Sequence, residues 1–285
     1  MIITEIDNNM GLGNQLFCYA TTRAIAYKKS YEFGIQGAKT YKGKDIIDLD
    51  FGMSIPTNHT YIYIQENLIR SSDGVDISPA DDRILNCPDG SKLAGNLQAM
   101  SYIKDYKKEL TEWLSIKPEK VINNFNHDDC CILHLRGGDH IGAPANSFLQ
   151  MEYYARAMQI MKSRNPNMKF YMVSDDIRVA NIYCKELDIY LTGSLMDGGQ
   201  DKYKASHHIG GDVSVDYAIL NSCRNVIMSN STFAFWPVWT NKNNPFVICP
   251  KFWFGHNRGY WSTGDMQVDE WNYLDKDGNY EETTV

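Results

Sequence analysis

Uninterrupted apolar runs alternate with helical patterns through the second half of this sequence. The runs typical of buried strands are 130–136, 168–174, 225–229 and a final one at 245–249. The helical patterns between them lie at 151–163 and 176–186, and "NSTFAFWPVWT" follows the third run. Strands that are apolar on both faces and separated by helices are typical of a parallel sheet covered on both sides. The sequence therefore predicts an α/β fold.

The first half shows the same pattern less clearly. A strand is expected at 1–6 and a helix at 14–28, whose apolar stripe consists of Leu16, Phe17, Ala20, Ala24 and Tyr27. A broken helix is expected at 91–116. Residues 40–90 hold short strand-like runs, such as 60–64, whose order in a sheet the pattern does not give.

A polar, turn-rich segment, "KPEKVINNFNHDD" at 117–129, separates the two patterns. A chain of 285 residues is long enough for two ordinary domains. We therefore expect an N-terminal half at 1–122 and a C-terminal half at 123–285.

Composition excludes several classes of protein. The net charge of −7, without any long basic run, argues against a nucleic-acid partner. The seven cysteines include no CxxC pair and lie mostly in apolar runs, which predicts buried, reduced thiols and no zinc site. No signal peptide or membrane-spanning run is present. The expected location is the cytoplasm, with peripheral attachment to the inner face of a membrane left open.

Ligands of parallel sheets bind outside the carboxyl ends of the strands. Four expected strand ends carry small, polar or charged residues: "MGLGNQ" at 10–15, "HLRGGD" at 134–139, "SDD" at 174–176 and "SNST" at 229–232. This agreement among four strand ends predicts a ligand site there.

The first of these stretches places Gly11 and Gly13 ahead of a helix whose free N–H groups suit an anion. It is neither a dinucleotide fingerprint, because Leu16 replaces the third glycine, nor a Walker loop. An ordinary strand-to-helix turn is the alternative interpretation.

The second stretch places His134 and Arg136 on one face of the strand. Arg136 could grip a phosphate in bidentate fashion, with Gly137 and Gly138 clearing space beside it. The alternatives are a structural ion pair for Arg136 and a hydrogen-bonded core position for His134.

The other two stretches have both a capping and a binding interpretation. Ser174 or Asp175 could cap the next helix, or a carboxylate of "SDD" could contact a ribose or base edge. Asp175 and Asp176 point apart, which disfavours a metal site. The residues of "SNST" could cap a helix or offer hydroxyls to a phosphate, with Pro237 expected in the first turn of that helix.

Together these stretches resemble the α-1,2-fucosyltransferases of glycosyltransferase family 11. The family's N-terminal pattern stands here as "GLGNQLFCYA" at 11–20, and its H-x-R-R-G-D stands as "HLRGGD". Its strand end "FSDD" is similar to "VSDD" at 173–176, its "SNSSFSWWGAWL" to residues 229–240, and its "PKxWF" to "CPKFWF" at 249–254.

The resemblance implies a GT-B architecture, in which two Rossmann-like halves with parallel sheets face a cleft. Residues 1–122 would be the acceptor side and 123–285 the GDP-sugar side. It implies an inverting, metal-independent transfer of L-fucose from GDP-β-L-fucose to a glycan hydroxyl, the 2-OH of a galactose-terminated acceptor, without a cofactor. Arg136 would hold the diphosphate and stabilise the departing GDP. The implied donor-binding residues are Gly11, Gly13, Asn14, Gln15, His134, Arg136, Ser174, Asp175, Asp176, Ser229, Asn230, Ser231 and Thr232.

One departure from the family and one catalytic group leave alternatives open. The family's second arginine is Gly137 here, so a non-catalytic binder of a nucleotide sugar or glycan, or a transferase for another GDP-sugar, are the rival functions. Asp139 is the candidate general base, and its structural alternative is to orient Arg136. His140 and Glu152 are further candidates, and the enzyme could also work without a base.

Overall fold

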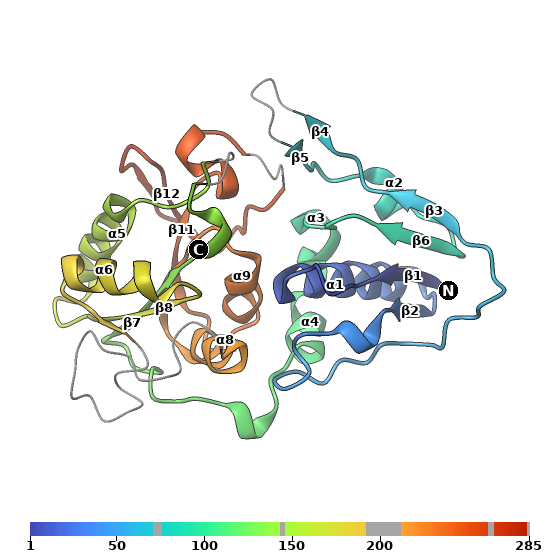
Figure 1. The fold of residues 1–285 in the computed structure, drawn as a ribbon, viewed down its shortest axis with the longest axis horizontal. Coiled ribbons are helices and arrows are strands. Elements are labelled where there is room, and N and C mark those ends of the chain that lie inside the picture. The colour runs from blue at the N-terminus through green and yellow to red at the C-terminus, as the bar shows by residue number, and fades with distance from the viewer. Residues whose placement is uncertain (71–75, 143–145, 192–211, 262–264, 284–285) are drawn as a thin grey trace. The chain divides into compact units, whose positions relative to one another are not determined.

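The computed structural model describes residues 1–70, 76–142, 146–191, 212–261 and 265–283. The chain forms two compact units: Met1–Lys117 with Ser262–Gln267, and Pro118–Trp261 with Val268–Val285. The division falls at the start of the polar segment 117–129, slightly before the expected boundary at residue 122. Each unit has its own parallel sheet (Figure 1), so the predicted α/β class is confirmed.

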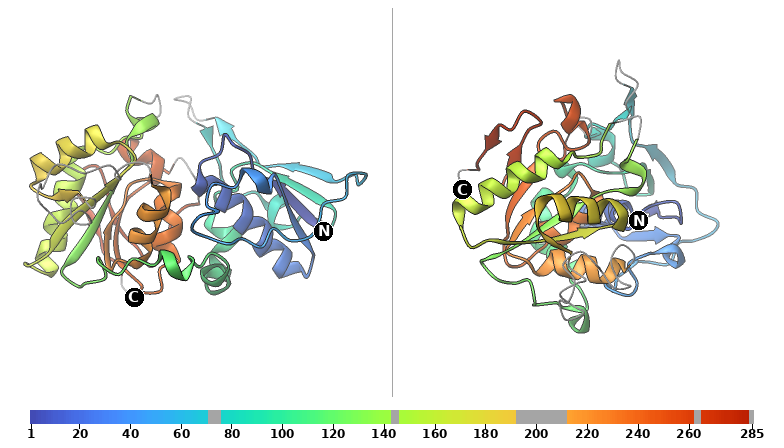
Figure 2. Two further views of the ribbon diagram at one scale, coloured as in Figure 1. Left: turned by 60° about the horizontal axis from the view of Figure 1, so that its bottom comes forward. Right: turned by 60° about the vertical axis from the view of Figure 1, so that its left-hand side comes forward.

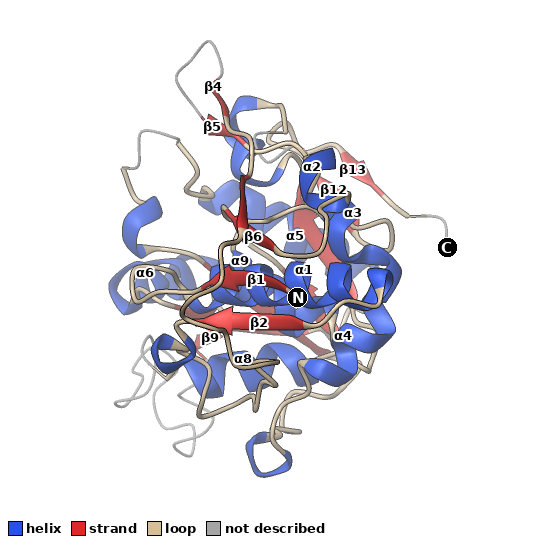
Figure 3. Ribbon diagram, turned by 90° about the vertical axis from the view of Figure 1, so that its right-hand side faces the viewer, coloured by secondary structure: helices blue, strands red, loops and turns tan. Residues whose placement is uncertain are grey.

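The first unit contains a four-stranded sheet in which all strands run parallel. Its order is β2 (Phe33–Gln36), β1 (Ile2–Glu5), β6 (Ser91–Ala94) and β3 (Ile62–Gln65). Figure 3 shows β1 between β2 and β6. Helix α1 (Leu12–Lys29) packs against β1 and β2 and ends where Ser30 takes a left-handed conformation.

The rest of the first unit consists of short elements. They are the 3₁₀ turns η1 (Ala38–Thr40) and η2 (Lys104–Tyr106), the helices α2 (Asp82–Leu85), α3 (Met100–Ile103) and α4 (Lys107–Trp113), and the antiparallel pair β4 (Ile69–Arg70) and β5 (Asp76–Ile77).

Two expectations for the first unit are wrong. Residues 91–94 form a strand instead of the start of a helix, because "SKLA" alternates and pairs with both β1 and β3. Tyr27 is 58% exposed, unlike the other residues of its predicted stripe, and its ring packs edge-on against Tyr106 and Trp113.

The second unit contains a seven-stranded sheet, parallel except for its last strand. Its order is β13 (Tyr280–Glu281), β12 (Asn272–Leu274), β11 (Phe246–Pro250), β10 (Asn225–Ile227), β7 (Cys130–Leu135), β8 (Lys169–Ser174) and β9 (Tyr190–Leu191). All six residues of β7 are buried, as expected for a central strand covered on both faces.

Helices cover both faces of this second sheet. Residues of α5 (Met151–Arg164) and α6 (Ile177–Leu187) share one buried cluster with β7 and β8. Helices α8 (Val213–Ser222) and α9 (Thr232–Trp239) contact each other, and Figure 2 shows them on the opposite side of the sheet. The remaining elements are the 3₁₀ turns η3 (Pro118–Lys120), η4 (Gly138–His140) and η5 (Trp253–Arg258).

The predicted strands and helices of the second half are confirmed, with two corrections. The strand at 245–249 is not the last, because β12 and β13 extend the sheet beyond it. Pro237 lies in the interior of α9 and not in its first turn. The prediction of buried cysteines is confirmed for all seven. None of the described helices is long and apolar enough to cross a bilayer.

Candidate active site

The second sheet changes direction between β7 and β10. From β7 the chain passes through α5 to β8 and through α6 to β9, moving toward one edge. From β10 it passes through α9 to β11 and on to β12, moving toward the other edge. Open α/β sheets bind ligands in the crevice at this kind of switch point, outside the carboxyl ends of the strands. "HLRGGD" spans the end of β7 and the residues after it, and "SNST" follows β10, so both predicted stretches lie at that point.

A buried hydrogen bond joins the two stretches. His134 Nδ1 lies 2.6 Å from Ser229 Oγ, and Tyr154 donates its hydroxyl to the carbonyl of His134 at 3.0 Å. Burial, helped by the charge of Arg136, lowers the pKa of His134 to about 3, so its imidazole is neutral. The structure thus gives His134 the core position considered as its alternative, where it fixes the Ser229 hydroxyl.

Arg136 lies just past the end of β7, between two carboxylates. Its guanidinium contacts Asp175, and it donates to Asp139 Oδ1 at 2.7 Å. The Asp175 carboxylate also accepts the Gly137 N–H at 2.7 Å, so it is held at two points. The contacts therefore fix where the guanidinium lies relative to β8.

The two carboxylates differ in how easily a ligand could replace them. Asp139 is 77% exposed, and an exposed ion pair contributes only about 0–1 kcal/mol. Asp175 is 34% exposed and anchored to the backbone of Gly137. Of the two carboxylates, Asp139 is therefore the more easily displaced from Arg136.

The two glycines after Arg136 lie close to Asp175 and Asp176, the residues that follow β8. A Cβ at Gly137 would lie 2.5 Å from the Cβ of Asp176. Gly138 has φ of +51°, and a Cβ there would lie 3.1 Å from Asp175 Oδ2. In this structure, Asp176 therefore occupies the space next to the position where the family pattern has its second arginine.

The structure assigns the capping role within "SDD" to the residue that the sequence did not favour. Asp176 Oδ1 accepts the N–H groups of Arg178 at 3.1 Å and Val179 at 3.4 Å, so Asp176 caps α6. Burial raises the pKa of Asp176, but hydrogen bonds from Val179 and Arg178 outweigh it, and the net shift is downward. Ser174 Oγ accepts the N–H of Asp176 at 3.1 Å.

The "SNST" stretch is buried and leads into α9. Asn230 donates to the carbonyl of Ser147 at 2.7 Å, and its buried Oδ1 has no partner among the described residues. Ser231 is the N-cap of α9 but makes no side-chain capping bond in the part of the chain described. Thr232 is the first residue of α9. The amino end of α9 follows β10 after a short connection and, like other helix amino ends, suits an anion.

The candidate bases differ in their surroundings. Asp139 is engaged with Arg136. His140 has its pKa lowered by burial and by Arg136, and its buried Nδ1 has no partner within the described ranges. Glu152 lies elsewhere, in a cavity of about 540 Å³ that Tyr153, Arg156 and His256 also line. The lowered pKa and the unpartnered Nδ1 keep His140 among the candidate bases.

The "GLGNQ" residues belong to the first unit. Gly11 is the N-cap of α1, and Gly13, Asn14 and Gln15 lie within its first turn. Gln15 donates to the carbonyls of Asp7 at 2.9 Å and Thr40 at 3.0 Å. Its Oε1 accepts the N–H of Lys42 at 2.9 Å. Gln15 therefore joins the segments that follow β1 and β2, which is a structural task.

A buried carboxyl group at the end of β3 escaped the sequence analysis. Glu66 is 3% exposed, accepts the N–H of Leu97 at 2.9 Å, and has its pKa raised mainly by burial. Gln98, next to Leu97, donates to Asn14 Oδ1 at 3.1 Å. Glu66 thus supports the loop that contacts the "GLGNQ" helix. The signal in the sequence was an acidic residue just after the strand-like run 60–64.

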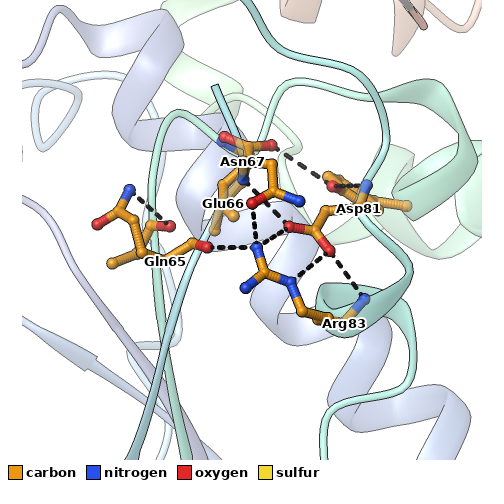
Figure 4. Close-up of polar contacts among 8 residues, drawn as sticks. Gln65, Glu66, Asn67, Asp81 and Arg83 are labelled. Atoms are coloured by element: carbon orange, nitrogen blue, oxygen red, sulfur yellow. Dashed lines mark hydrogen bonds and ion pairs between the residues drawn. The ribbon is translucent and has the colours of Figure 1, made fainter. Parts of the chain in front are cut away.

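A network around Arg83 holds the chain on both sides of Glu66 (Figure 4). Arg83 donates to the carbonyl of Gln65 at 3.0 Å, to Asn67 Oδ1 at 2.5 Å and to Asp81 Oδ2 at 2.6 Å. Asp81 also accepts the N–H of Asn67 at 3.1 Å. These contacts fix the carboxyl end of β3 against α2.

Asp216 is a second buried carboxyl group that the sequence analysis missed. It lies in the first turn of α8 and is 8% exposed. Burial, followed by repulsion from Asp212 and Asp175, raises its pKa to about 8. An acid inside the apolar run "VSVDYAIL" was the signal in the sequence. At neutral pH Asp216 is largely protonated and can donate a hydrogen bond near Asp175.

Replacing Asp216 with asparagine is expected to change how stability depends on pH. An acid whose pKa rises on folding binds its proton more tightly when folded, so stability is lost as pH rises from about 4 toward 8. Asp216→Asn removes this loss, so it should raise the urea midpoint at pH 8 and leave it nearly unchanged at pH 4. Parallel pH curves for the two proteins would contradict the assignment.

Comparison with known sequences agrees with this geometry. The sequence profile of Glycosyl transferase family 11 matches residues 95–275, which is more than half of the chain. The chain therefore belongs to glycosyltransferase family 11, as the four stretches predicted.

Three individual proteins are similar to this chain. The O-antigen biosynthesis glycosyltransferase WbnK of Escherichia coli is 27% identical over 145 residues, which span 49% of this chain and 42% of WbnK. An α-1,2-colitosyltransferase of Escherichia coli is 23% identical over 93% of this chain and 97% of its own length. The structure of the fucosyltransferase NodZ from Bradyrhizobium matches with a TM-score of 0.44 and 12% identity, over 83% of this chain and 91% of that one.

Proposed function

We propose that this chain is an inverting glycosyltransferase that moves L-fucose from GDP-β-L-fucose to a glycan hydroxyl, the 2-OH of a galactoside. The observation that carries the proposal is Arg136, held by Asp175 at the switch point of the second sheet. Family membership supplies the reaction class, and the site supplies a cation where a diphosphate would lie.

Departure of GDP places new negative charge on the diphosphate. Among the described residues of this unit, the Arg136 guanidinium and the amino end of α9, which begins at Thr232, are two groups that suit this charge. A preorganised donor of this kind contributes about 10²–10³-fold in rate. Because a side-chain cation takes this role, we propose that the transfer needs no metal.

The acceptor hydroxyl must lose a proton as the new bond forms. His140, with an unpartnered Nδ1 among the described atoms, and Asp139, paired with Arg136, are the two bases that this loop offers. Substituting each residue in turn distinguishes which of the two acts as the base. If His140 is the base, His140→Gln lowers kcat more than Asp139→Asn.

A second donor is favoured by one of the relatives. The α-1,2-colitosyltransferase aligns over 97% of its length, and colitose is L-fucose without the 3-hydroxyl. Gly137 is the departure from the fucosyltransferase motif that leaves room for this alternative. The test therefore compares two donors, GDP-fucose and GDP-colitose.

The test is a transfer reaction with lactose, EDTA and either donor, followed by NMR of the product. We expect a new α-linked sugar on the galactose 2-hydroxyl, formed in the presence of EDTA. Product from GDP-colitose alone would show that GDP-colitose is the donor, and the proposed mechanism would still apply. GDP binding without product from either donor would instead support a non-catalytic binder.

A further inference from the structure

The first unit contains a groove on its sheet. A cavity of about 880 Å³ has Gln36 and Lys39 at one end and His59 and Tyr61 at the other. A second cavity of about 530 Å³ shares His59 and Tyr61 and continues to Asp89. We call the two together the sheet groove. Each of the two cavities by itself falls within the roughly 300–1,000 Å³ of typical small-molecule sites.

Two glycines build one wall of the sheet groove. Residues 51–53 run antiparallel to β2, with a bridge between Gly34 and Gly52 and a bond from the N–H of Met53 to the carbonyl of Phe33 at 2.8 Å. A Cβ at Gly34 would lie 2.9 Å from Ile55, and one at Gly52, where φ is +74°, would lie 2.2 Å from the carbonyl oxygen of Phe33. The wall is therefore formed by backbone pairing before any ligand binds.

The segment that follows this wall crosses to the other edge of the sheet. It leads from β2 to β3, the strands at opposite edges, and Figure 1 shows it passing around the amino ends of the strands. Ile3 and Lys92, paired across β1 and β6, line the sheet groove between these edges. The sheet groove is thus long and runs across the strands.

The lining suits sugar rings, which carry apolar C–H faces and polar hydroxyls. The rings of His59 and Tyr61 lie 4.5 Å apart at 67°, and the buried Tyr61 hydroxyl has no hydrogen-bond partner within the described residues. Lys92 Nζ donates to Gln36 at 2.9 Å and Glu5 at 2.7 Å, so the charge of Lys92 is paired with a carboxylate. An aromatic body with convergent polar groups fits a neutral oligosaccharide better than an anion.

One end of the sheet groove joins the carboxyl edge of the sheet. Gln36 is the last residue of β2, and Lys39 follows it and leads into Thr40, whose carbonyl accepts from Gln15 of the "GLGNQ" helix at 3.0 Å. A chain of sugars lying in the sheet groove would therefore emerge at the strand ends where ligands of this fold bind.

We propose that the sheet groove binds the acceptor glycan as an extended oligosaccharide, holding the sugars that precede the residue to be glycosylated. This inference rests on the proposed function for the reaction that the bound glycan undergoes. The inference concerns the substrate class. The acceptor would be an oligosaccharide of several neutral sugars, and the protein would contact sugars beyond its terminal disaccharide.

Tyr61→Ala tests the proposal, with Tyr63→Ala as its matched control. Tyr63 belongs to β3, is 62% exposed and lies outside the described lining of both cavities. For the wild type we expect a KM at least tenfold lower for a galactose-ended tetrasaccharide than for lactose. Tyr61→Ala should abolish that difference, while Tyr63→Ala should keep it. Lactose kinetics and GDP affinity should be unchanged in both variants.

Saturation-transfer NMR with the same two glycans separates this inference from the proposed function. Loss of tetrasaccharide binding in Tyr61→Ala supports the sheet groove even when GDP-fucose yields no product. If the wild type transfers sugar and Tyr61→Ala still binds and prefers the tetrasaccharide, the sheet groove is not the acceptor site. The proposed function is then unaffected. A wild type that binds neither glycan also overturns it.

Discussion

Arg136→Ala is expected to lower kcat/KM for transfer by about 10²–10³-fold without unfolding the protein. The Arg136 side chain is 30% exposed just past the end of β7, and its guanidinium contacts two loop carboxylates, so we expect its removal to leave the fold intact. Its loss leaves Asp139 and Asp175 facing the diphosphate without a cation, which adds repulsion to the lost stabilisation. Initial rates over a range of GDP-fucose concentrations measure the effect.

Two further variants show whether Arg136 acts by its charge and shape. Arg136→Lys keeps the charge but loses the planar fork, so it should recover only part of the rate. Asp139→Asn removes the exposed partner and should cost less than Arg136→Ala. Turnover close to the wild type in Arg136→Ala, with unchanged circular dichroism, would exclude Arg136 from the site.

Gly137→Arg, which restores the doublet of the family, is expected to lower activity instead of raising it. A Cβ at this residue would lie 2.5 Å from the Cβ of Asp176, so any side chain there displaces the end of β8 or the loop after β7. Overpacking of this kind costs about 1–3 kcal/mol. Displacement of Asp175 would also disturb the contact that fixes Arg136. Urea unfolding and transfer rates measure the two effects.

A double-mutant cycle isolates this clash. Gly137→Ala alone should destabilise the protein, and in an Asp176→Gly background, which removes the opposing Cβ, the added cost should disappear. The loss of the α6 cap in Asp176→Gly affects both arms of the cycle equally. A Gly137→Arg variant that is faster than the wild type would show that the loop accommodates the second arginine.

The sequence was sufficient to find the carboxyl edge of the second sheet. Apolar runs predicted the positions of β7, β8, β10 and β11 along the chain, and the polar residues at their ends marked "HLRGGD", "SDD" and "SNST". Parallel strands place their carboxyl ends together, so these stretches had to converge. What the pattern could not show is which carboxylate contacts Arg136, because that depends on the spacing between β7 and β8.

The residue that caps α6 was also not predictable from the sequence. Ser174, Asp175 and Asp176 are all able to cap a helix, and only the backbone conformation after β8 selects Asp176. Buried acids were also hidden, since neither Glu66 nor Asp216 belongs to a recognisable motif. Their significance comes from burial and raised pKa, which depend on the packing of distant segments.

The first unit was harder to predict because its strands are short and out of order. β6 pairs between β1 and β3, so "SKLA" becomes a central strand through contacts that a local pattern does not contain. The sheet groove depends on Gly34 and Gly52 meeting across a loop, which the sequence does not indicate.

The central claim is that Arg136 stabilises the GDP leaving group in a glycosyl transfer reaction. The most direct measurement is GDP release from GDP-fucose in EDTA, with and without lactose, for the wild type and Arg136→Ala. Release that lactose stimulates in the wild type, and that falls by about 10²–10³-fold in Arg136→Ala, is the predicted result. GDP binding with no release in the wild type, or equal release from both proteins, would contradict the account.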